Sequence, residues 1–173
     1  KRHQHYLPKP EKKIHDREVL TNCIGALIQH DSSHHLWSPY MTEKLYLVTS
    51  LDDHSRMLLF ADFFTRETAW VHILALASVF LQHGCPLKYY PGQHSIFRYV
   101  HDRDKHNPWH TYTKSTDDVL TQWGLVLAAC NVDVTYALSP QAKGKIERPY
   151  RWLQDRIVRI AAREHLTTIA QLR

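Results

Sequence analysis

The order of apolar runs along this chain is the feature that most constrains its fold. Three runs typical of strands follow one another closely, and they read "CIGALIQHD", "KLYLVTSLDD" and "MLLFADFF". A turn-like "DHSR" separates the second run from the third, which suggests a meander. Helical patterns then alternate with two further short strands, so the chain is predicted to be a mixed α/β domain with one sheet flanked by helices.

The first helical pattern covers residues 65–84, "TRETAWVHILALASVFLQHG". Thr65 and Thr68 are suitable capping residues, and Gly84 with Pro86 predicts the end of the helix. "PLKYY" predicts a short strand, "STDDVLTQWGLVLAACN" a second helix and "VDVTYALSP" a last strand. The chain closes with a segment that repeats apolar residues at spacings of three and four, "GKIERPYRWLQDRIVRIAAREHL".

Pro149 limits where this final helix begins. Proline is tolerated in the first turn of a helix but not in its interior, so the helix is expected to begin just before Pro149. Glu147 then falls in the opening turn.

Composition and charge indicate a folded domain with a polyanionic partner. Of the 173 residues, 43% are hydrophobic, and the formal net charge is +5. Residues 1–20 are basic and contain two prolines, so they are predicted to be an arm or linker before a core domain at 21–173. We expect the chain to be a fragment of a longer protein.

Cysteine usage and hydropathy indicate an intracellular protein. The three cysteines are scattered and form no CxxC pair, which favours buried thiols in a reducing compartment over a disulfide frame or a structural zinc site. No apolar run approaches twenty residues, so neither a membrane span nor a signal peptide is predicted. The expected location is the cytoplasm.

Two acids are candidates for metal-dependent chemistry. Asp31 is expected at the carboxyl end of the first strand, and Glu147 stands in the basic segment "SPQAKGKIERPYRWLQDR". Carboxylates are suitable ligands for Mg²⁺ or Mn²⁺, and the surrounding bases are suited to a phosphate backbone. The bases predicted to contact DNA are Lys143, Lys145, Arg148 and Arg151, with a stripe along the helix formed by Arg148, Arg156, Arg159 and Arg163.

Four motifs resemble those of a known family. "LIQHDSSHHLW", "LDDHSR", "YYPGQHSIFR" and "SPQAKGKIER" are similar to successive motifs in the retroviral-integrase-like catalytic core of bacterial insertion-sequence transposases, the DDE group. The resemblance implies a ribonuclease H-like fold with a five-stranded mixed sheet, dependence on Mg²⁺ or Mn²⁺, cleavage at transposon ends and transfer to target DNA. It also implies a homo-oligomer in the bacterial cytoplasm. The family's first acid falls on Asp31 and its glutamate on Glu147.

The second acid of the family is missing. Aligning "YYPGQHSIFR" with the family motif places Gly92 where aspartate is expected. We therefore expect impaired catalysis, and the alternative is a non-catalytic DNA-binding or assembly domain descended from a transposase. A third possibility is rescue of the metal site by His94, Asp102 or Asp104.

Other conspicuous residues have structural interpretations. Asp52 and Asp53 are expected to stabilise a turn by bonding local backbone. Trp37 is expected to pack beside the site rather than to stack on a base. Trp70 and Trp152 are expected in the core or at an interface.

Overall fold

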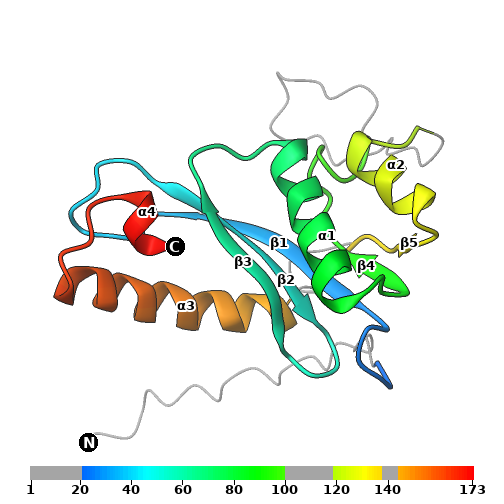
Figure 1. Cartoon of the computed structure of the whole chain (residues 1–173), viewed down its shortest axis with the longest axis horizontal. Coiled ribbons are helices and arrows are strands. Elements are labelled where there is room, and N and C mark those ends of the chain that lie inside the picture. The colour runs from blue at the N-terminus through cyan, green and yellow to red at the C-terminus, as the bar shows by residue number, and fades with distance from the viewer. Residues whose placement is uncertain (1–20, 100–118, 138–143) are drawn as a thin grey trace, which may run out of the picture.

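The computed structural model describes residues 21–99, 119–137 and 144–173, with the side chains of Gly144 and Lys145 excepted. Five strands form one sheet in the order β3-β2-β1-β4-β5 (Figure 1). The strands are β1 (Ile28–His35), β2 (Leu45–Asp52), β3 (Leu58–Phe64), β4 (Lys88–Tyr90) and β5 (Asp133–Val134). The helices are α1 (Ala69–His83), α2 (Gln122–Ala129), α3 (Gly144–Arg163) and α4 (Ile169–Leu172).

The sheet is mixed. The pairs β1–β2 and β2–β3 are antiparallel, as expected of a meander, whereas β1–β4 and β4–β5 are parallel. The predicted α/β class and the five-stranded mixed sheet are therefore confirmed.

Helices α1 and α3 cover opposite faces of this sheet. Successive side chains of a strand point to opposite faces, and Leu47 and Val48 on β2 show the result. Leu47 packs in one cluster with Ile146 and Tyr150 of α3, whereas Val48 packs with residues of α1. Whether a residue on β1 or β2 faces α1 or α3 thus depends on which of the two alternating sets of side chains along the strand it belongs to.

Helix α1 begins and ends at the residues that cap it. The Thr68 side chain accepts a hydrogen bond from the Val71 backbone N–H at 3.3 Å, and the helix begins at the next residue. Gly84 follows the helix at φ 88, a conformation that glycine adopts without strain. The prediction of a helix in 65–84 is confirmed, with Thr68 rather than Thr65 as its cap.

The second helix is shorter than predicted. Helix α2 begins at Gln122, after the cap residue Thr121, and residues 115–118 lie outside the described part of the chain. Trp123 and Leu127 of α2 are buried against Leu76 of α1 and Tyr89 of β4. Val119 and Leu120, which fall inside the predicted helical segment, are exposed and lie ahead of the helix.

Strand β1 does not end at Asp31, contrary to the prediction. It continues to His35 because β2 pairs with it along its whole length, up to His35 opposite Leu45. Its parallel partner β4 stops at Tyr90, so only the pairing with β4 ends near Asp31. The last strand is also shorter than predicted, since β5 covers only Asp133 and Val134.

Helix α3 begins at Gly144, five residues before Pro149, so the prediction that it starts just before the proline is wrong. Proline at this depth removes one backbone hydrogen bond. Ile146 and Tyr150 lie on either side of it and are both buried against the sheet. Packing of this first turn therefore outweighs the cost of the proline.

Two further predictions concern the surface. Cys23, Cys85 and Cys130 are all exposed free thiols, so the prediction of buried cysteines is wrong. Within the described ranges, no helix is both long and apolar enough to cross a bilayer.

Candidate active site and nucleic-acid interface

Asp31 lies on the face of the sheet that α3 covers. Alternation along β1 places Asp31 with Ser33, and the Ser33 hydroxyl accepts a hydrogen bond from the Gln154 amide of α3 at 2.9 Å. Thr49 is the partner of Asp31 across β1 and β2, and its hydroxyl donates to the Tyr150 hydroxyl at 2.7 Å. Helix α3 therefore covers the face of β1 that carries Asp31.

Glu147 lies in the first turn of α3, three residues before Tyr150. Helix residues three apart are neighbours, with Cβ atoms about 5–6 Å apart. The side chain is exposed, and within the described part of the chain its carboxylate has no hydrogen bond or ion pair. Asp31 and Glu147 thus lie on the same side of the sheet, with Tyr150 as their common neighbour.

The Tyr150 hydroxyl is affected by the charge of a further acid, Glu67. Burial raises the pKa of the Tyr150 hydroxyl, and the charges of Asp31 and Glu67 raise it further, while the hydrogen bond with Thr49 opposes them. Both carboxylates therefore lie within electrostatic reach of this one phenol.

Gly92 lies just after the end of β4. In the parallel register the last partners are Gln29 and Tyr90, so the pairing ends two residues before Asp31 on one side and two residues before Gly92 on the other. The Ala137 backbone N–H donates to the Pro91 carbonyl at 3.0 Å, which holds this segment against the chain after β5. Glycine provides no side chain at this position.

The rescue ligands proposed from the sequence gain no support. His94 is exposed, and its Nδ1 accepts from the Ile96 backbone N–H at 3.3 Å. Asp102 and Asp104 lie outside the described residues. Among the residues that are described, no group of three or more His, Cys, Asp and Glu side chains is placed to hold a metal ion.

Glu67 is a site residue that the sequence prediction missed. It lies just before α1, and its Oε1 accepts hydrogen bonds from the Ser32 hydroxyl and from His72 Nε2, the latter at 3.1 Å. Burial pushes the pKa of Glu67 up, but these hydrogen bonds and the nearby histidines outweigh burial and hold it below its usual value. Glu67 is therefore a carboxylate anchored to the residue that follows Asp31.

A buried hydrogen-bond chain continues from Glu67 into the core. His72 Nδ1 lies 2.9 Å from His30 Nε2, and His30 Nδ1 lies 2.9 Å from the Ser50 hydroxyl. An ionised carboxylate only accepts, so His72 donates to Glu67 through Nε2. The chain thus links Glu67 through two buried histidines to Ser50 on β2.

One feature of the sequence indicates this hydrogen-bond chain. His72 stands among the apolar residues of the buried stripe of α1, in register with Ala75, Leu76 and Val79, and it is fully buried. A histidine at such a position needs partners for both ring nitrogens, and Glu67 precedes it by five residues.

Comparisons with known proteins agree with this fold, although no family model matches the sequence. The fold matches the catalytic core domain of BIV integrase with a TM-score of 0.56 over 86% of this chain and 78% of that one, at 17% identity. Over 146 residues the chain is 32% identical to the transposase for insertion sequence IS1202 of Streptococcus pneumoniae, and over 151 residues it is 30% identical to the putative transposase y4bF of Sinorhizobium fredii. The chain is therefore similar to part of these insertion-sequence transposases, and its fold is that of an integrase catalytic core.

The fold of this chain is thus ribonuclease H-like, as the motif resemblance implied. The matches cover 84% and 87% of the chain but only 29% and 31% of the two transposases. The chain therefore spans about a third of the length of these relatives.

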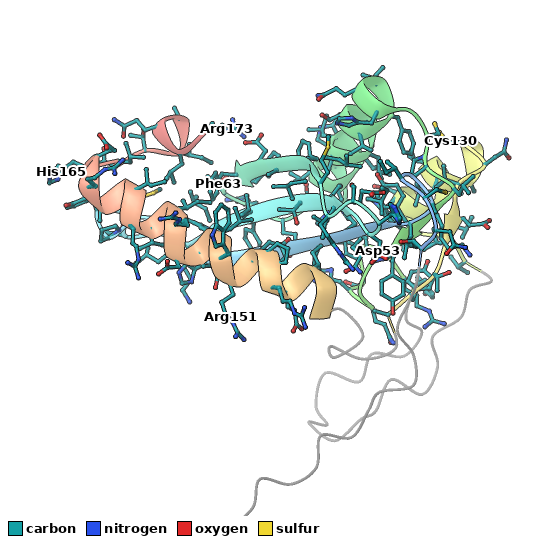
Figure 2. All side chains as sticks on the ribbon, turned by 90° about the horizontal axis from the view of Figure 1, so that it is seen from below. Asp53, Phe63, Cys130, Arg151, His165 and Arg173 are labelled. Carbon is teal, nitrogen blue, oxygen red and sulfur yellow. The ribbon has the colours of Figure 1, made fainter. Side chains whose placement is uncertain are left out.

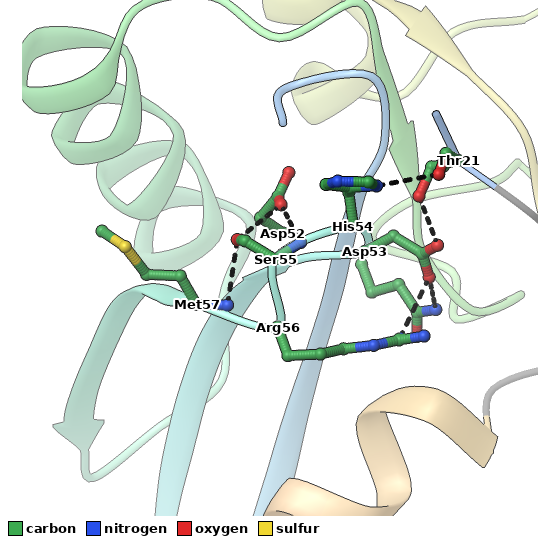
Figure 3. A network of polar contacts seen from close by, with 8 residues as sticks. Thr21, Asp52, Asp53, His54, Ser55, Arg56 and Met57 are labelled. Atoms are coloured by element: carbon green, nitrogen blue, oxygen red, sulfur yellow. Dashed lines mark hydrogen bonds and ion pairs between the residues drawn. The ribbon is translucent and has the colours of Figure 1, made fainter. Parts of the chain in front are cut away.

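Asp52 and Asp53 lie at the turn between β2 and β3 (Figure 3). Asp52 accepts from the backbone N–H groups of Gly25 at 2.9 Å and Ser55 at 2.7 Å. Burial raises the pKa of Asp52, but these bonds outweigh it and the net pKa is lowered. The bond from Ser55 confirms the predicted turn role of Asp52. Asp53 has a structural role of another kind, because it accepts from side chains, among them Gln29 Nε2 at 2.6 Å.

The arginines of α3 that are predicted to contact DNA fall into two groups. Arg159 is paired with Asp155 at 2.8 Å and Arg163 with Glu164 at 2.7 Å. Arg148 and Arg151 are exposed, and in the described part of the structure neither guanidinium has an ion pair. Figure 2 shows Arg151 pointing away from the sheet. The predicted contact Lys143 lies outside the described residues, as does the side chain of Lys145.

The tryptophans differ in their exposure. Trp37 is fully buried and its Nε1 donates to the Leu45 carbonyl at 2.9 Å, which confirms the packing role. Trp152 and Trp70 are 61% and 64% exposed, so a position in the core is wrong for both.

Proposed function

We propose that this chain is the catalytic core of an insertion-sequence transposase, which binds transposon ends and target DNA and whose cleavage and strand-transfer chemistry is impaired by Gly92. The observation that carries the proposal is the placement of Asp31 on the face of the sheet crossed by the first turns of α3, which contain Glu147. Gly92 follows the last residue of β4 by two positions, as Asp31 follows the last β1 residue that pairs with β4. The similarity to two transposases supports the same activity class.

The donor set fits one divalent cation. Mg²⁺ is commonly held by one or two carboxylates, with waters and substrate phosphates as the remaining ligands, and Asp31 and Glu147 supply that set for Mg²⁺ or Mn²⁺. A pair of such ions activates the attacking oxygen and stabilises the leaving one in phosphoryl transfer. Without a side chain at Gly92, a second ion lacks a protein ligand from this strand.

The other residues position these groups. Tyr150 fills the space behind Asp31, excludes water there and is fixed by Thr49. Glu67 holds Ser32, and thereby the backbone that carries Asp31. Arg148 and Arg151 hold the DNA backbone without reading its sequence, and we assign Lys143 and Lys145 the same role.

Gly92 also favours a second candidate function, a descendant that binds DNA ends or partner subunits without cutting. Removing one group that stabilises transition-state charge typically lowers a rate by about 10²–10³-fold. Both candidates share the same DNA surface and differ only in chemistry.

The decisive experiment compares the wild-type chain with Gly92→Asp. Among the described glycines only Gly25 and Gly84 have positive φ, so the backbone at position 92 accepts an L side chain without that strain. Binding of Mn²⁺ is measured by calorimetry, and nicking of a transposon-end DNA is measured in parallel. We expect Gly92→Asp to bind Mn²⁺ more tightly and to nick at least about 100-fold faster.

Glu147→Gln in each background is the matched control. It is expected to abolish the gain in both readouts. Equal nicking by the wild-type chain and Gly92→Asp would show that another ligand substitutes, and it would overturn the proposed impairment. Mn²⁺ binding that is unchanged by Glu147→Gln and by Asp31→Asn would overturn the metal assignment.

We further propose that the protein works as a homo-oligomer on DNA in the bacterial cytoplasm. A structural neighbour with a TM-score of 0.50 and 16% identity belongs to a simian T-cell lymphotropic virus intasome, and it matches 76% of this chain. Light scattering with and without end DNA tests this proposal, and a monomer under both conditions contradicts it.

A further inference from the structure

A shallow groove runs along the solvent side of α3, next to the candidate active site. Its volume is about 540 Å³, and it is lined by Glu147, Arg148, Arg151, Trp152 and Asp155. Ligand pockets typically have volumes of about 300–1,000 Å³, so one nucleotide fits a groove of this size.

Trp152 supplies an aromatic surface in this groove. Its side chain is 61% exposed, and within the described part of the chain its indole N–H has no hydrogen-bond partner. Arg148 precedes it by one helical turn and Asp155 follows it by three residues, so their side chains are its neighbours on the helix surface.

The charges around Trp152 favour an anionic ligand. Asp155 is neutralised by Arg159 at 2.8 Å, whereas Arg148 and Arg151 have no ion pair among the described residues. Among the described residues, Glu147 is the one other acid that lines the groove. The groove therefore presents two available guanidinium groups and one exposed indole beside a candidate metal ligand.

We propose that this groove binds an unpaired nucleotide at the transposon end, with its base stacked on Trp152 and its phosphates held by Arg148 and Arg151. This inference rests on the proposed DNA-binding function. Bases in a duplex present only their edges, whereas an unpaired or extruded base exposes the flat face that an indole accepts. The chemistry of the groove therefore selects a single-stranded extension or a flipped base, and its position next to Glu147 places that nucleotide close to the reacting phosphodiester.

Trp70 provides a matched control for Trp152. It is 64% exposed on α1, which covers the opposite face of the sheet, and it does not line the groove. Arg159 provides the corresponding control for Arg151, since it is exposed on the same helix but paired with Asp155.

The test measures binding of the full chain to two end DNAs, one blunt and one with an unpaired extension that carries 2-aminopurine. Stacking on an aromatic side chain changes affinity by roughly fivefold to a hundredfold per base. We expect the wild-type chain, Trp70→Ala and Trp152→Phe to prefer the extended DNA by a factor in that range and to quench the 2-aminopurine fluorescence. Trp152→Ala should lose both the preference and the quenching while its melting temperature stays unchanged.

The arginine variants separate this inference from general DNA binding. Arg151→Ala should weaken binding of both DNAs severalfold, and Arg159→Ala should have a smaller effect. If DNA binds but Trp152→Ala retains the preference, or if Trp70→Ala loses it equally, the nucleotide site is wrong and the proposed function stands. If the wild-type chain binds neither DNA, both proposals fail.

Discussion

Glu67 shows how a residue outside the family motifs becomes part of the site. Asp31, Glu147 and the unusual Gly92 could be identified from the sequence because each lies in a recognisable motif. Glu67 could not, because its partners Ser32 and His72 meet it only after α1 has packed against the sheet. The local spacing of Glu67 and His72 indicates a pair, but it does not indicate that the pair reaches β1.

Glu67→Gln is expected to destabilise the fold by about 1–3 kcal/mol at neutral pH, since a buried charge-assisted network loses its acceptor. The pKa of Glu67 is lower in the folded chain than the ordinary value of 4.5, so its carboxylate stabilises the folded state above that value. This contribution is lost as pH falls through the lowered folded pKa. Urea denaturation at neutral and acidic pH checks both statements.

The control for this variant is Glu164→Gln, which removes an exposed acid paired with Arg163. It should change stability by less than about 1 kcal/mol. Equal losses for the two variants, or a loss for Glu67→Gln that persists unchanged in acid, would contradict the role assigned to Glu67.

At the scale of elements, the existence of most helices and strands was predictable and several of their ends were not. Thr68 and Gly84 mark the ends of α1 because capping is local chemistry. The extension of β1 to His35 depends on pairing with β2. The periodicity of apolar residues within one strand does not show this pairing. Helix α4 did have a local signal, since Thr168 and Gln171 form a capping box, but that pattern was not used in the prediction.

Pro149→Ala is expected to stabilise the chain by about 2–3 kcal/mol. An interior proline costs a helix about 3 kcal/mol, and the flexibility that alanine adds to the unfolded chain offsets up to about 1 kcal/mol of the gain. Urea denaturation followed by circular dichroism measures the change. Arg156→Ala, an exposed replacement on the same helix, should be nearly neutral, and a loss of stability for Pro149→Ala would contradict the helix geometry described.

At the scale of the whole molecule, the resemblance implied the five-stranded mixed sheet, but it did not show which residues face each helix. The register of β1 with β4 ends two residues before Asp31 and Gly92, and the alternation of side chains along β1 places Asp31 towards α3. Both facts depend on contacts between segments far apart in the sequence. The division of the basic stripe into paired and available arginines depends on side-chain geometry for the same reason.

The net charge of +5 gives a salt-dependent affinity for DNA if the available arginines face the duplex. Each phosphate contact contributes about 0.9 to the slope of log K against log salt. The double replacement of Arg148 and Arg151 by alanine should therefore lower that slope by about 1.8. Fluorescence anisotropy over a series of salt concentrations measures it, and an equal reduction for the paired Arg159 and Arg163 would contradict the assignment.

Helix α3 is tied to the rest of the molecule along its length. Gln154 is held by Ser33, and the Tyr40 hydroxyl donates to the Ala162 carbonyl at 3.1 Å. After α4, Arg173 reaches back to Asp62 on β3 at 2.8 Å. A helix fixed in this way keeps the distance between Trp152 and Asp31 constant. If a base stacks on the Trp152 indole, the number of nucleotides between that base and the scissile bond is set by the protein framework and not by the sequence of the DNA.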